Sequence, residues 1–212
     1  MSRKDIVRSC VDCGVINCST LDKKFPGFCV SESLDSEWLD EVLPLYQEEP
    51  NHEVAVASAE IEHDYYCRLT RVEETILFAQ KIGAEKIGIA TCVGLLKESR
   101  IFASLLRERG FTVIGAGCKI GTVPKHTIGV PQRCEEVGVS MCNPIAQAKY
   151  LNQQGTDLNI VVGLCVGHDS LFYKYSEAIT TTLIVKDRVL VHNPAAALYA
   201  ADGYYTQKLH DN

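Results

Sequence analysis

Four short apolar runs lie along the chain after residue 85, and amphipathic segments separate them. The runs are Lys86 to Thr91, Phe111 to Ala116, Leu158 to Leu164 and Thr180 to Val185. Each has the length of a buried strand, and the segments between them carry apolar residues at helical spacing. Buried strands that alternate with helices are typical of βαβ units. The pattern therefore predicts an α/β fold, Rossmann-like or flavodoxin-like, with a parallel sheet and helices on both faces.

Local residue chemistry predicts where several helices begin. Thr70-Arg71-Val72-Glu73 has the S/T-x-x-E form of a capping box. Asn143-Pro144 places an N-cap residue before a proline at the first helical position, and Asn193-Pro194 repeats this start near the C-terminus. After the third apolar run, Asp169 or Ser170 is expected to cap another helix.

The first thirty-four residues differ from the rest of the chain. They hold Cys10, Cys13, Cys18 and Cys29 and few large aliphatic side chains, which predicts a loop-rich module that a bound metal would order. The stretches over residues 35–49 and 53–66 then show helical spacing of apolar side chains. We therefore expect a Cys-rich module over residues 1–34 and an α/β domain over residues 35–212.

Composition narrows the class of protein. The chain has 212 residues, of which 46% are hydrophobic and 23% charged, as in ordinary globular domains. Twenty-one basic and 27 acidic residues give a net charge of −6, which disfavours nucleic-acid partners. The N-terminus leads into polar, Cys-rich sequence instead of an apolar signal core, and the apolar runs are too short to span a membrane. We expect a cytoplasmic protein without membrane contact, and its oligomeric state stays open.

Ten cysteines do not fit an ordinary domain. Without a signal peptide, such a count indicates metal ligation or thiol chemistry. Cys92, Cys118 and Cys165 follow the first three predicted strands. Parallel strands share one direction, so we expect these thiols on the carboxyl edge of the sheet, where such folds bind ligands. Cys67 and Cys142 precede predicted helix starts that open on the same edge, and they are expected to join the others.

Several thiolates cannot share one edge without compensating positive charge, because desolvation and mutual repulsion would keep them protonated. A metal centre resolves this conflict. Thiolate ligands from separate elements favour an iron–sulfur cluster, with zinc as the alternative. We expect Cys92, Cys118 and Cys165 as ligands, with Cys142 or Cys67 as the fourth ligand or as a nearby free thiol. The simpler alternative is that small, apolar cysteines are tolerated at buried strand ends.

The four N-terminal cysteines pose a separate question. Cys10-x2-Cys13 forms a tight metal-binding turn, but the spacing to Cys18 and Cys29 matches neither the ferredoxin run nor a paired zinc ribbon. A zinc or iron–sulfur site and a set of reduced or redox-active thiols both remain open, as does the number of centres. Cys134, in a long Gly- and Pro-rich stretch, is a weaker candidate.

Other polar residues flank the expected cysteine edge. His168 is a candidate acid/base group or cofactor contact, although a turn histidine bonded to the backbone explains it equally well. Asn143 caps the helix that follows Cys142, so we expect it beside the cofactor too. Lys119 is a candidate for steering an anionic substrate, and a solvated lysine is the simpler interpretation. The sequence contains no G-x-G-x-x-G, P-loop or G-x-S-x-G motif, so nucleotide binding and serine hydrolysis lack support.

The sequence resembles a family of cysteine-rich proteins of unknown function, found mainly in anaerobic bacteria and archaea and often described as metal-binding. The resemblance rests on Cys92-Val-Gly, Cys118-Lys-Ile-Gly, Cys142-Asn-Pro-Ile-Ala-Gln-Ala and Val-Gly-Leu-Cys165-Val-Gly-His-Asp. It covers nearly the whole chain, including the Cys10-Val-Asp-Cys13-Gly segment. The resemblance implies metal binding and a reducing cytoplasm, and it implies no activity.

Three hypotheses follow. The first is a metalloprotein whose cysteine-ligated cluster, iron–sulfur in our interpretation, performs redox or sulfur chemistry on a small molecule or with a redox partner. The second is a sensor or binding module in which zinc or another metal is structural and no reaction is catalysed. The third is thiol or persulfide transfer without a metal, with a low-pKa cysteine such as Cys165 near a helix start as the nucleophile.

Overall fold

The computed structural model describes residues 6–22 and 24–210. The chain divides into two compact units, Met1–Ala59 and Glu60–Asn212, and each is considered by itself. Among the described helices, none combines the length and the apolar character needed to cross a lipid bilayer. The second unit holds the sheet and the cysteines that follow its strands.

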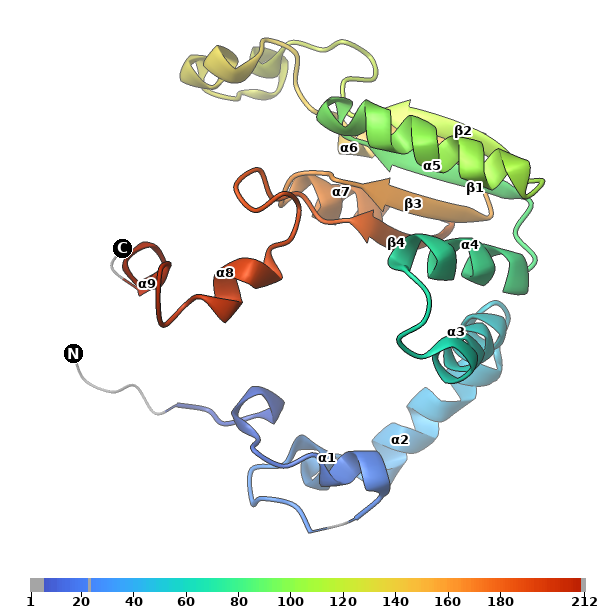
Figure 1. Cartoon of the computed structure of the whole chain (residues 1–212), viewed down its shortest axis with the longest axis vertical. Coiled ribbons are helices and arrows are strands. Elements are labelled where there is room, and N and C mark those ends of the chain that lie inside the picture. The colour runs from blue at the N-terminus through green and yellow to red at the C-terminus, as the bar shows by residue number, and fades with distance from the viewer. Residues whose placement is uncertain (1–5, 23, 211–212) are drawn as a thin grey trace. The chain divides into compact units, whose positions relative to one another are not determined.

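The second unit is built on a sheet of four parallel strands (Figure 1). The strands are β1 (Lys86–Thr91), β2 (Thr112–Gly117), β3 (Leu158–Val162) and β4 (Ile179–Ile184), and they lie in the order β2-β1-β3-β4. Each predicted apolar run overlaps one strand, so the α/β class and the parallel sheet are confirmed. The chain steps from β1 to one side for β2 and later returns to the other side for β3. Sheets of this kind bind ligands at such a switch point, outside the carboxyl ends of the strands.

Helices cover both faces of the sheet, as predicted. On one face lie α4 (Arg71–Lys81) and α5 (Leu96–Glu108), and on the other lie α6 (Pro144–Gln153) and α7 (His168–Tyr175). On the first face, Ile76 and Phe102 belong to the same buried cluster as Ile87 of β1. On the second face, Leu151 and Phe172 are completely buried. Burial of each large apolar side chain contributes about 1.5–3 kcal/mol, which fixes the helices on the sheet.

Side-chain caps set two helix starts as predicted. Thr70 Oγ1 accepts a hydrogen bond from the Glu73 backbone N–H, and the Glu73 carboxylate accepts one from the Thr70 N–H at 2.8 Å. Asn143 Oδ1 accepts the Ala146 N–H at 3.2 Å, and Pro144 follows at the first helical position of α6. Caps of this kind stabilise a helix by about 1 kcal/mol. The Asn143 cap also fixes the start of α6 directly after Cys142.

The helix after β3 begins earlier than predicted. The sequence indicated Asp169 or Ser170 as the cap, whereas α7 starts at His168 with Gly167 at the N-cap. Gly167 has a φ of 84°, which glycine adopts without steric cost, so the chain turns into the helix at once. The Asp169 carboxylate instead accepts the Ser170 N–H at 2.8 Å. His168 therefore lies in the first turn of α7, where its N–H donates to the Cys165 carbonyl at 2.9 Å.

A buried amide in the middle of β3 requires a glycine on β1. Asn159 is completely buried, accepts a hydrogen bond from Thr156 Oγ1 at 2.8 Å and donates one to Ser176 Oγ at 2.8 Å. A Cβ atom on Gly88 would lie 2.0 Å from Asn159 Oδ1. The amide therefore fits only because β1 carries no side chain at this position.

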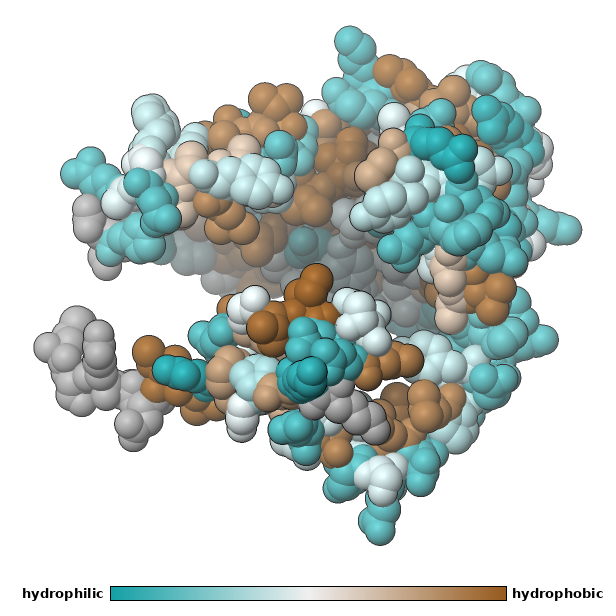
Figure 2. Space-filling view, turned by 60° about the horizontal axis from the view of Figure 1, so that its bottom comes forward, coloured by the Kyte–Doolittle hydropathy of each residue, from teal (hydrophilic) through white to brown (hydrophobic). Residues whose placement is uncertain are grey.

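The first unit has little regular structure before α3. It contains 3-10 turns at Cys10–Asp12 and Asn17–Thr20, then α1 (Val30–Ser33), α2 (Ser36–Val42) and a further 3-10 turn over Leu43–Gln47. Asp35 caps α2, and Pro44 lies in the turn that ends it, close to the predicted end. The helix α3 (Asn51–Tyr65) then leads toward the second unit. Apolar side chains such as Trp38 remain exposed here, and Figure 2 shows apolar atoms scattered among polar ones on one face of the molecule.

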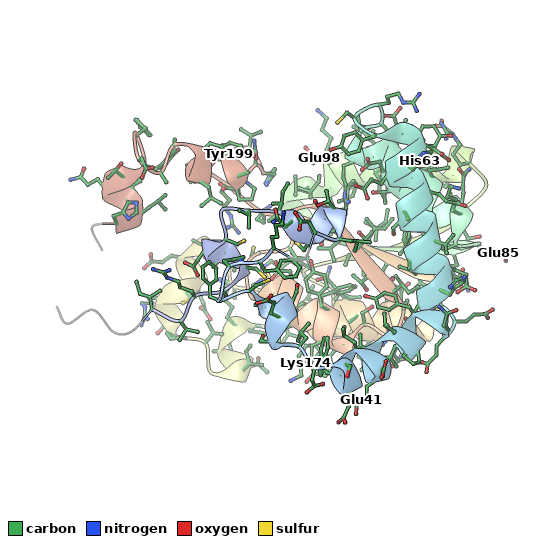
Figure 3. All side chains as sticks on the ribbon, turned by 90° about the horizontal axis from the view of Figure 1, so that it is seen from below. Glu41, His63, Glu85, Glu98, Lys174 and Tyr199 are labelled. Atoms are coloured by element: carbon green, nitrogen blue, oxygen red, sulfur yellow. The ribbon has the colours of Figure 1, made fainter. Side chains whose placement is uncertain are left out.

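Two short helices, α8 (Ala195–Tyr199) and α9 (Thr206–His210), follow β4. The helix α8 begins one residue later than predicted: Pro194 is its N-cap and not its first residue, and proline has no side-chain acceptor with which to cap the helix. Charged side chains such as Glu85, Glu98 and Lys174 project from the surface of the second unit (Figure 3).

Candidate functional site

Four cysteines reach the carboxyl edge of the sheet. Cys92 directly follows β1, Cys118 directly follows β2, and Cys165 comes shortly after β3. Backbone hydrogen bonds hold these segments together: the Cys118 N–H donates to the Thr91 carbonyl at 2.8 Å, and the Asn143 N–H donates to the Cys118 carbonyl at 2.8 Å. The second bond places Cys142, one residue before Asn143, beside the end of β2. The sheet and the start of α6 thus position the cysteines together.

Three of these side chains form a hydrogen-bonded row, which we call the cysteine row: Cys92, Cys118 and Cys142. Cys118 lies in the middle and is hydrogen-bonded to both of the others. Cys142 is also hydrogen-bonded to the imidazole of His168. Cys92 and Cys118 are buried, and Cys142 is partly exposed. The row therefore runs from the interior of the sheet edge toward the first turn of α7.

Cationic side chains contact the sulfurs. Lys186 Nζ lies 3.4 Å from Cys92 Sγ, and Lys119 Nζ lies 3.4 Å from Cys142 Sγ. Cys165 has a cation of its own, because Arg188 Nη2 donates to its Sγ at 2.9 Å. The Val93 backbone N–H points at Cys118 Sγ across 3.4 Å. The edge thus combines thiols with positive charge, the condition under which thiolates are stable.

Hydrogen bonds and nearby charges shift the pKa values of the three cysteines of the row in different directions. Hydrogen bonds from Cys118 and His168, with help from Lys119, lower the pKa of Cys142 to about 3. A hydrogen bond from Cys118, with Gly94 N–H and Lys186, lowers the pKa of Cys92 to about 5. The same bonds and burial raise the pKa of Cys118, which stays a thiol. At neutral pH the end sulfurs, Cys92 and Cys142, are therefore thiolates, and the single S–H of Cys118 donates to one of them at a time.

The thiolate of Cys142 also affects the protonation of His168. Its hydrogen bond raises the pKa of His168, which favours the imidazolium. His168 was a candidate acid/base group, and the structure places its ring against a cysteine of the row.

The segment after β4 supplies the two cations that the sequence analysis missed. Lys186 lies shortly after the end of β4, and Arg188 begins the turn over residues 188–192. Asp187 between them accepts backbone N–H bonds from Val189 and Leu190, both at 2.8 Å. We call residues 185–193 the cation arm. The sequence signal that could have indicated the cation arm is the alternation of basic and acidic residues in Lys186-Asp187-Arg188, directly after a predicted strand.

Two hydrogen bonds between His192 and Asp187 hold the cation arm in a turn, and two glycines lie next to its Lys186 side chain. The His192 N–H donates to the Asp187 carbonyl at 2.9 Å, and the Asp187 N–H donates to His192 Nδ1 at 3.2 Å. A Cβ on Gly94 would lie 3.7 Å from Lys186 Nζ, and one on Gly163 would lie 3.8 Å from Lys186 Cδ. The two glycines therefore line the path of the lysine from β4 to Cys92.

A buried glutamine ties together the strand ends from which Cys92 and Cys118 emerge. Gln147 of α6 is completely buried, and its Nε2 donates to the Thr91 carbonyl at 3.2 Å and to the Ala116 carbonyl at 2.6 Å. Its Oε1 is buried without a partner among the described residues. Gln147 thus sets the separation of the two strand ends.

The remaining candidate cysteines of the second unit are Cys67 and Cys134. Cys67 is exposed, with a φ of 56°, between α3 and α4. Cys134 lies in the long stretch after β2, where its carbonyl accepts a hydrogen bond from Lys125 Nζ. In the first unit, Cys10 and Cys18 are exposed and Cys29 is partly exposed. Cys13, also partly exposed, donates its S–H to the Val15 carbonyl at 2.8 Å.

The cysteines of this edge have the chemistry of metal ligands, but their described arrangement is not that of a metal site. Soft thiolate sulfurs that come from separate elements have the chemistry of iron or zinc ligands. Within residues 6–22 and 24–210, however, no group of three or more His, Cys, Asp and Glu side chains is arranged to hold a metal ion. The described arrangement pairs each end sulfur of the row with a lysine. Metal ligation therefore stays a prediction.

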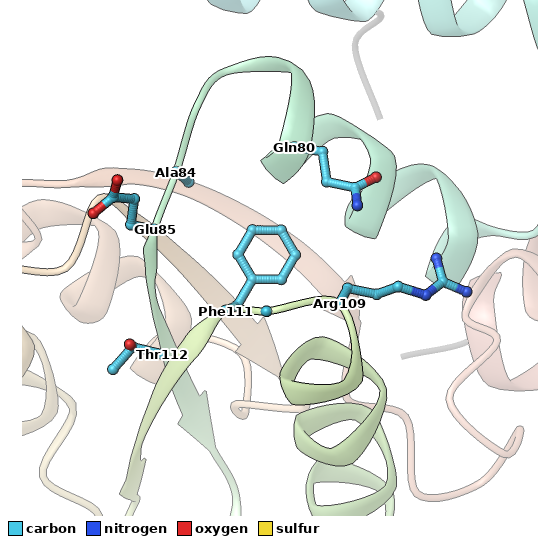
Figure 4. Close-up of a pocket in the computed structure, with 7 residues that line it drawn as sticks. Gln80, Ala84, Glu85, Arg109, Phe111 and Thr112 are labelled. Atoms are coloured by element: carbon cyan, nitrogen blue, oxygen red, sulfur yellow. The ribbon is translucent and has the colours of Figure 1, made fainter.

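A pocket of about 420 Å³ lies at the opposite end of the sheet (Figure 4). It is lined by Gln80, Glu85, Arg109 and Phe111, among others, next to the amino ends of β1 and β2. None of its lining residues is a cysteine or a histidine. It therefore takes no part in the cysteine chemistry.

Comparison with known proteins confirms the expected resemblance to a family of unknown function, and it leaves metal binding as a prediction. Residues 29–183 match a family described as protein of unknown function, DUF1847. The chain belongs to this family. It is also 44% identical to the uncharacterised protein MJ0455 of Methanocaldococcus jannaschii over 196 residues, which cover 92% of this chain and 98% of that protein. These descriptions assign no activity to the family, so the function must be argued from the site.

Proposed function

We propose that this protein carries a redox-active sulfur centre at the carboxyl edge of its sheet, and that the centre performs redox or sulfur chemistry on a small molecule. The observation that carries the proposal is the position of Cys118. It is hydrogen-bonded to Cys92 and to Cys142, and each of these end sulfurs contacts a lysine. A thiol beside a stabilised thiolate is the arrangement that thiol–disulfide exchange requires.

The charge balance supports a centre made of the sulfurs themselves. Two thiolates on one edge would repel each other unless positive charge compensates them. Lys186 supplies it at Cys92, and Lys119 supplies it at Cys142, where His168 adds a further donor. The row therefore holds its thiolates with side chains of this chain, so thiol chemistry without a metal is the function that the geometry supports best.

The proposed step is an exchange in two stages. The Cys142 thiolate attacks one sulfur of a small-molecule disulfide, an S–S bond forms to Cys142, and the leaving thiolate takes the electron pair. The Cys118 thiol gives up its proton to the departing thiolate or to solvent and attacks Cys142 Sγ. The mixed disulfide then releases the second thiolate, and a Cys118–Cys142 disulfide remains. The small molecule gains two electrons, the two cysteines lose two, and every step is reversible.

Thiolate stabilisation sets the preferred direction. Because Lys119 and His168 favour the Cys142 thiolate, they stabilise the reduced pair relative to its disulfide. The disulfide form is then readily reduced, so it passes its oxidation on to a thiol. A reducing cytoplasm would return the pair to the dithiol state.

The test is the product of exchange in metal-free protein. Because the reduced pair is favoured, reduced protein is treated with a large excess of bis(2-hydroxyethyl) disulfide and mapped by mass spectrometry without reduction. We expect a Cys118–Cys142 disulfide in the parent chain and a trapped mixed disulfide on Cys142 in Cys118→Ala. Cys67→Ala, which changes an exposed cysteine outside the row, is the matched control and should behave like the parent. Modification confined to exposed cysteines such as Cys67, with the row unchanged, would overturn the proposal.

An iron–sulfur cluster on the same edge is the second candidate. The convergence of thiols from the ends of β1, β2 and β3 and from the start of α6 favours it, since such clusters take cysteines from separate elements. Cys92, Cys118 and Cys142 would hold it, with Cys165 as the fourth ligand. A cluster would supply one-electron transfer or an open iron to a small molecule, whereas a zinc ion would give a structural or sensing module without catalysis.

Metal analysis separates the two candidates. Protein purified without oxygen is analysed for iron, acid-labile sulfide and zinc, together with its visible absorption spectrum. Thiol exchange predicts that iron, sulfide and zinc are unchanged in Cys118→Ala. Metal that is stoichiometric in the parent and lost in Cys118→Ala would favour the metal centre instead. A variant with Cys10, Cys13, Cys18 and Cys29 changed to serine shows whether any metal belongs to the N-terminal module, which we propose as a separate site.

A further inference from the structure

We infer that the small molecule that exchanges with this centre is an anionic low-molecular-weight disulfide, and that Arg188 on the cation arm binds its negative group. The inference rests on the proposed function and adds the substrate class. Two observations support it: the cations at the sheet edge contact sulfur atoms and no described carboxylate, and Arg188 is exposed to solvent.

The cations at the edge are paired with sulfur and not with carboxylates. In the described part of the chain, the ion pairs with carboxylates involve His63, Lys81, His126 and Lys149. Lys119, Lys186 and Arg188 are absent from that set, although acidic residues outnumber basic ones in the chain as a whole. Asp187, the carboxylate between Lys186 and Arg188 in sequence, accepts the backbone N–H groups of Val189 and Leu190. Within residues 6–22 and 24–210, no carboxylate forms an ion pair with these three basic side chains of the edge.

The Arg188 side chain has more hydrogen-bond donors than it uses within the described residues. Its guanidinium carries five N–H groups, and among the described residues its side-chain contact is the one from Nη2 to Cys165 Sγ. The residue is exposed, so the remaining donors face water. A guanidinium fork of this kind matches a carboxylate or a similar planar anion with two parallel hydrogen bonds. Arg188 is thus suited to hold an anion while it stays in contact with a thiol.

An anion at Arg188 would lie close to the sulfurs. Arg188 Nη2 lies 2.9 Å from Cys165 Sγ, and Cys92 and Cys142 reach the same carboxyl edge of the sheet as Cys165. Exposure decreases in the same direction: Arg188 is exposed, Cys165 and Cys142 are partly exposed, and Cys118 is buried. A disulfide whose negative group sits on Arg188 can therefore present its sulfurs to the partly exposed thiols first.

The turn between β3 and α7 leaves the approach open. Val166 is 92% exposed, and a Cβ added to Gly167 would meet no atom within 4 Å. This turn lies at the switch point of the sheet, where parallel α/β folds bind their ligands. Within the second unit, the turn therefore leaves room for a small molecule at Gly167, close to Cys165.

The experiment compares three disulfides of similar size and different charge: 3,3′-dithiodipropionate, bis(2-hydroxyethyl) disulfide and cystamine. The measured quantity is the second-order rate constant for formation of the Cys118–Cys142 disulfide in reduced, metal-free protein at low ionic strength. We expect the dianion to react about tenfold faster than the neutral compound, and the dication more slowly than both, because the local charge concentrates the anion. High salt should reduce these differences.

Two variants test the role of Arg188. Arg188→Gln should lower the ratio of the anionic to the neutral rate constant about tenfold. Arg107→Gln removes the same charge from the last turn of α5, at the other end of the sheet, and should leave the ratio unchanged. Equal rate constants for all three disulfides, or an unchanged ratio in Arg188→Gln, would overturn the inference and leave the proposed exchange intact. If none of the disulfides oxidises the row, the proposed function itself fails.

Discussion

Lys186 Nζ lies 3.4 Å from Cys92 Sγ, although the two residues are 94 positions apart in the chain. The contact reaches past one strand, because Lys186 follows the edge strand β4, Cys92 follows the inner strand β1, and β3 lies between these two strands. Its consequence is chemical, because an ammonium group beside a thiol favours the thiolate. The cysteine edge therefore depends on a segment that contains no cysteine.

Replacement of Lys186 by methionine should raise the pKa of Cys92 above its present value of about 5. Methionine keeps the apolar stem and removes the charge, so the thiolate loses its hydrogen bond and its Coulomb partner. Thiolate absorbance at 240 nm, followed against pH in metal-free protein, measures the change. Lys174→Met, at an exposed position of α7, is the control and should leave the titration unaltered. An unshifted curve in Lys186→Met would mean that the lysine does not stabilise this thiolate.

Replacement of Cys118 by alanine should raise the pKa values of Cys92 and Cys142 together. The hydrogen bond with Cys118 is the largest single cause of each lowered pKa, and the one S–H proton of Cys118 is donated to one of the two thiolates at a time. The rate of alkylation by iodoacetamide against pH, resolved by residue with mass spectrometry, gives each pKa. A shift of Cys142 alone would show that Cys118 shares no proton with Cys92.

Stability should rise with pH in metal-free protein between about pH 5 and pH 8. Cys142 and Cys92 have pKa values of about 3 and about 5 in the folded chain, below the usual thiol value of 9.0. In this window the unfolded chain binds more protons at these groups, so the free energy of unfolding increases with pH. His168 has a raised pKa and acts in the opposite sense, because its contribution is present at low pH and is lost as pH rises.

Urea unfolding at several pH values measures this dependence. The Cys92→Ala, Cys142→Ala double variant should show a smaller increase of stability with pH than the parent, because the two lowered thiols are gone. Cys67→Ala should keep the parent's increase. A double variant with the same pH dependence as the parent would contradict the assignment of thiolates to these two positions.

Replacement of Gln147 by leucine should destabilise the second unit by about 1–3 kcal/mol, because two buried hydrogen bonds, each contributing about 0.5–1.5 kcal/mol, are lost. Gln147 donates to the carbonyls of Thr91 and Ala116, at the ends of β1 and β2. Urea denaturation gives the free energy of unfolding, and Gln153→Leu, exposed on the same helix, is the matched control. Equal losses in the two variants would show that the strand-end contacts contribute no specific stability.

Replacement of Gly88 by alanine should destabilise the fold by more than about 2 kcal/mol, because its Cβ would lie 2.0 Å from Asn159 Oδ1 in a packed interior. Gly115→Ala on β2 is the control, since a Cβ there would meet no atom within 4 Å. The Gly88→Ala, Asn159→Ala double variant should recover part of the loss, as expected for residues in contact. Additive losses would contradict a direct clash.

The sequence by itself determined the strands, the helices on both faces and the cysteines that follow the strands. Strand and helix periods are local properties of a few neighbouring residues, and so are caps such as Thr70-x-x-Glu73. Because parallel strands share one direction, the ends of β1, β2 and β3 had to meet at one edge. The start of α7 escaped prediction, since the positive φ of Gly167 depends on the turn that joins β3 to the helix.

Tertiary structure alone decided how the thiols are charged. The sequence indicated that thiolates at one edge need positive charge, and it suggested a metal as the source. The folded chain brings Lys186, Arg188 and His168 to those sulfurs from positions that no local pattern connects. Hydrogen bonds and Coulomb interactions act over a few ångströms in space and are independent of separation along the chain. Their partners therefore become known only when the sheet places its strand ends side by side.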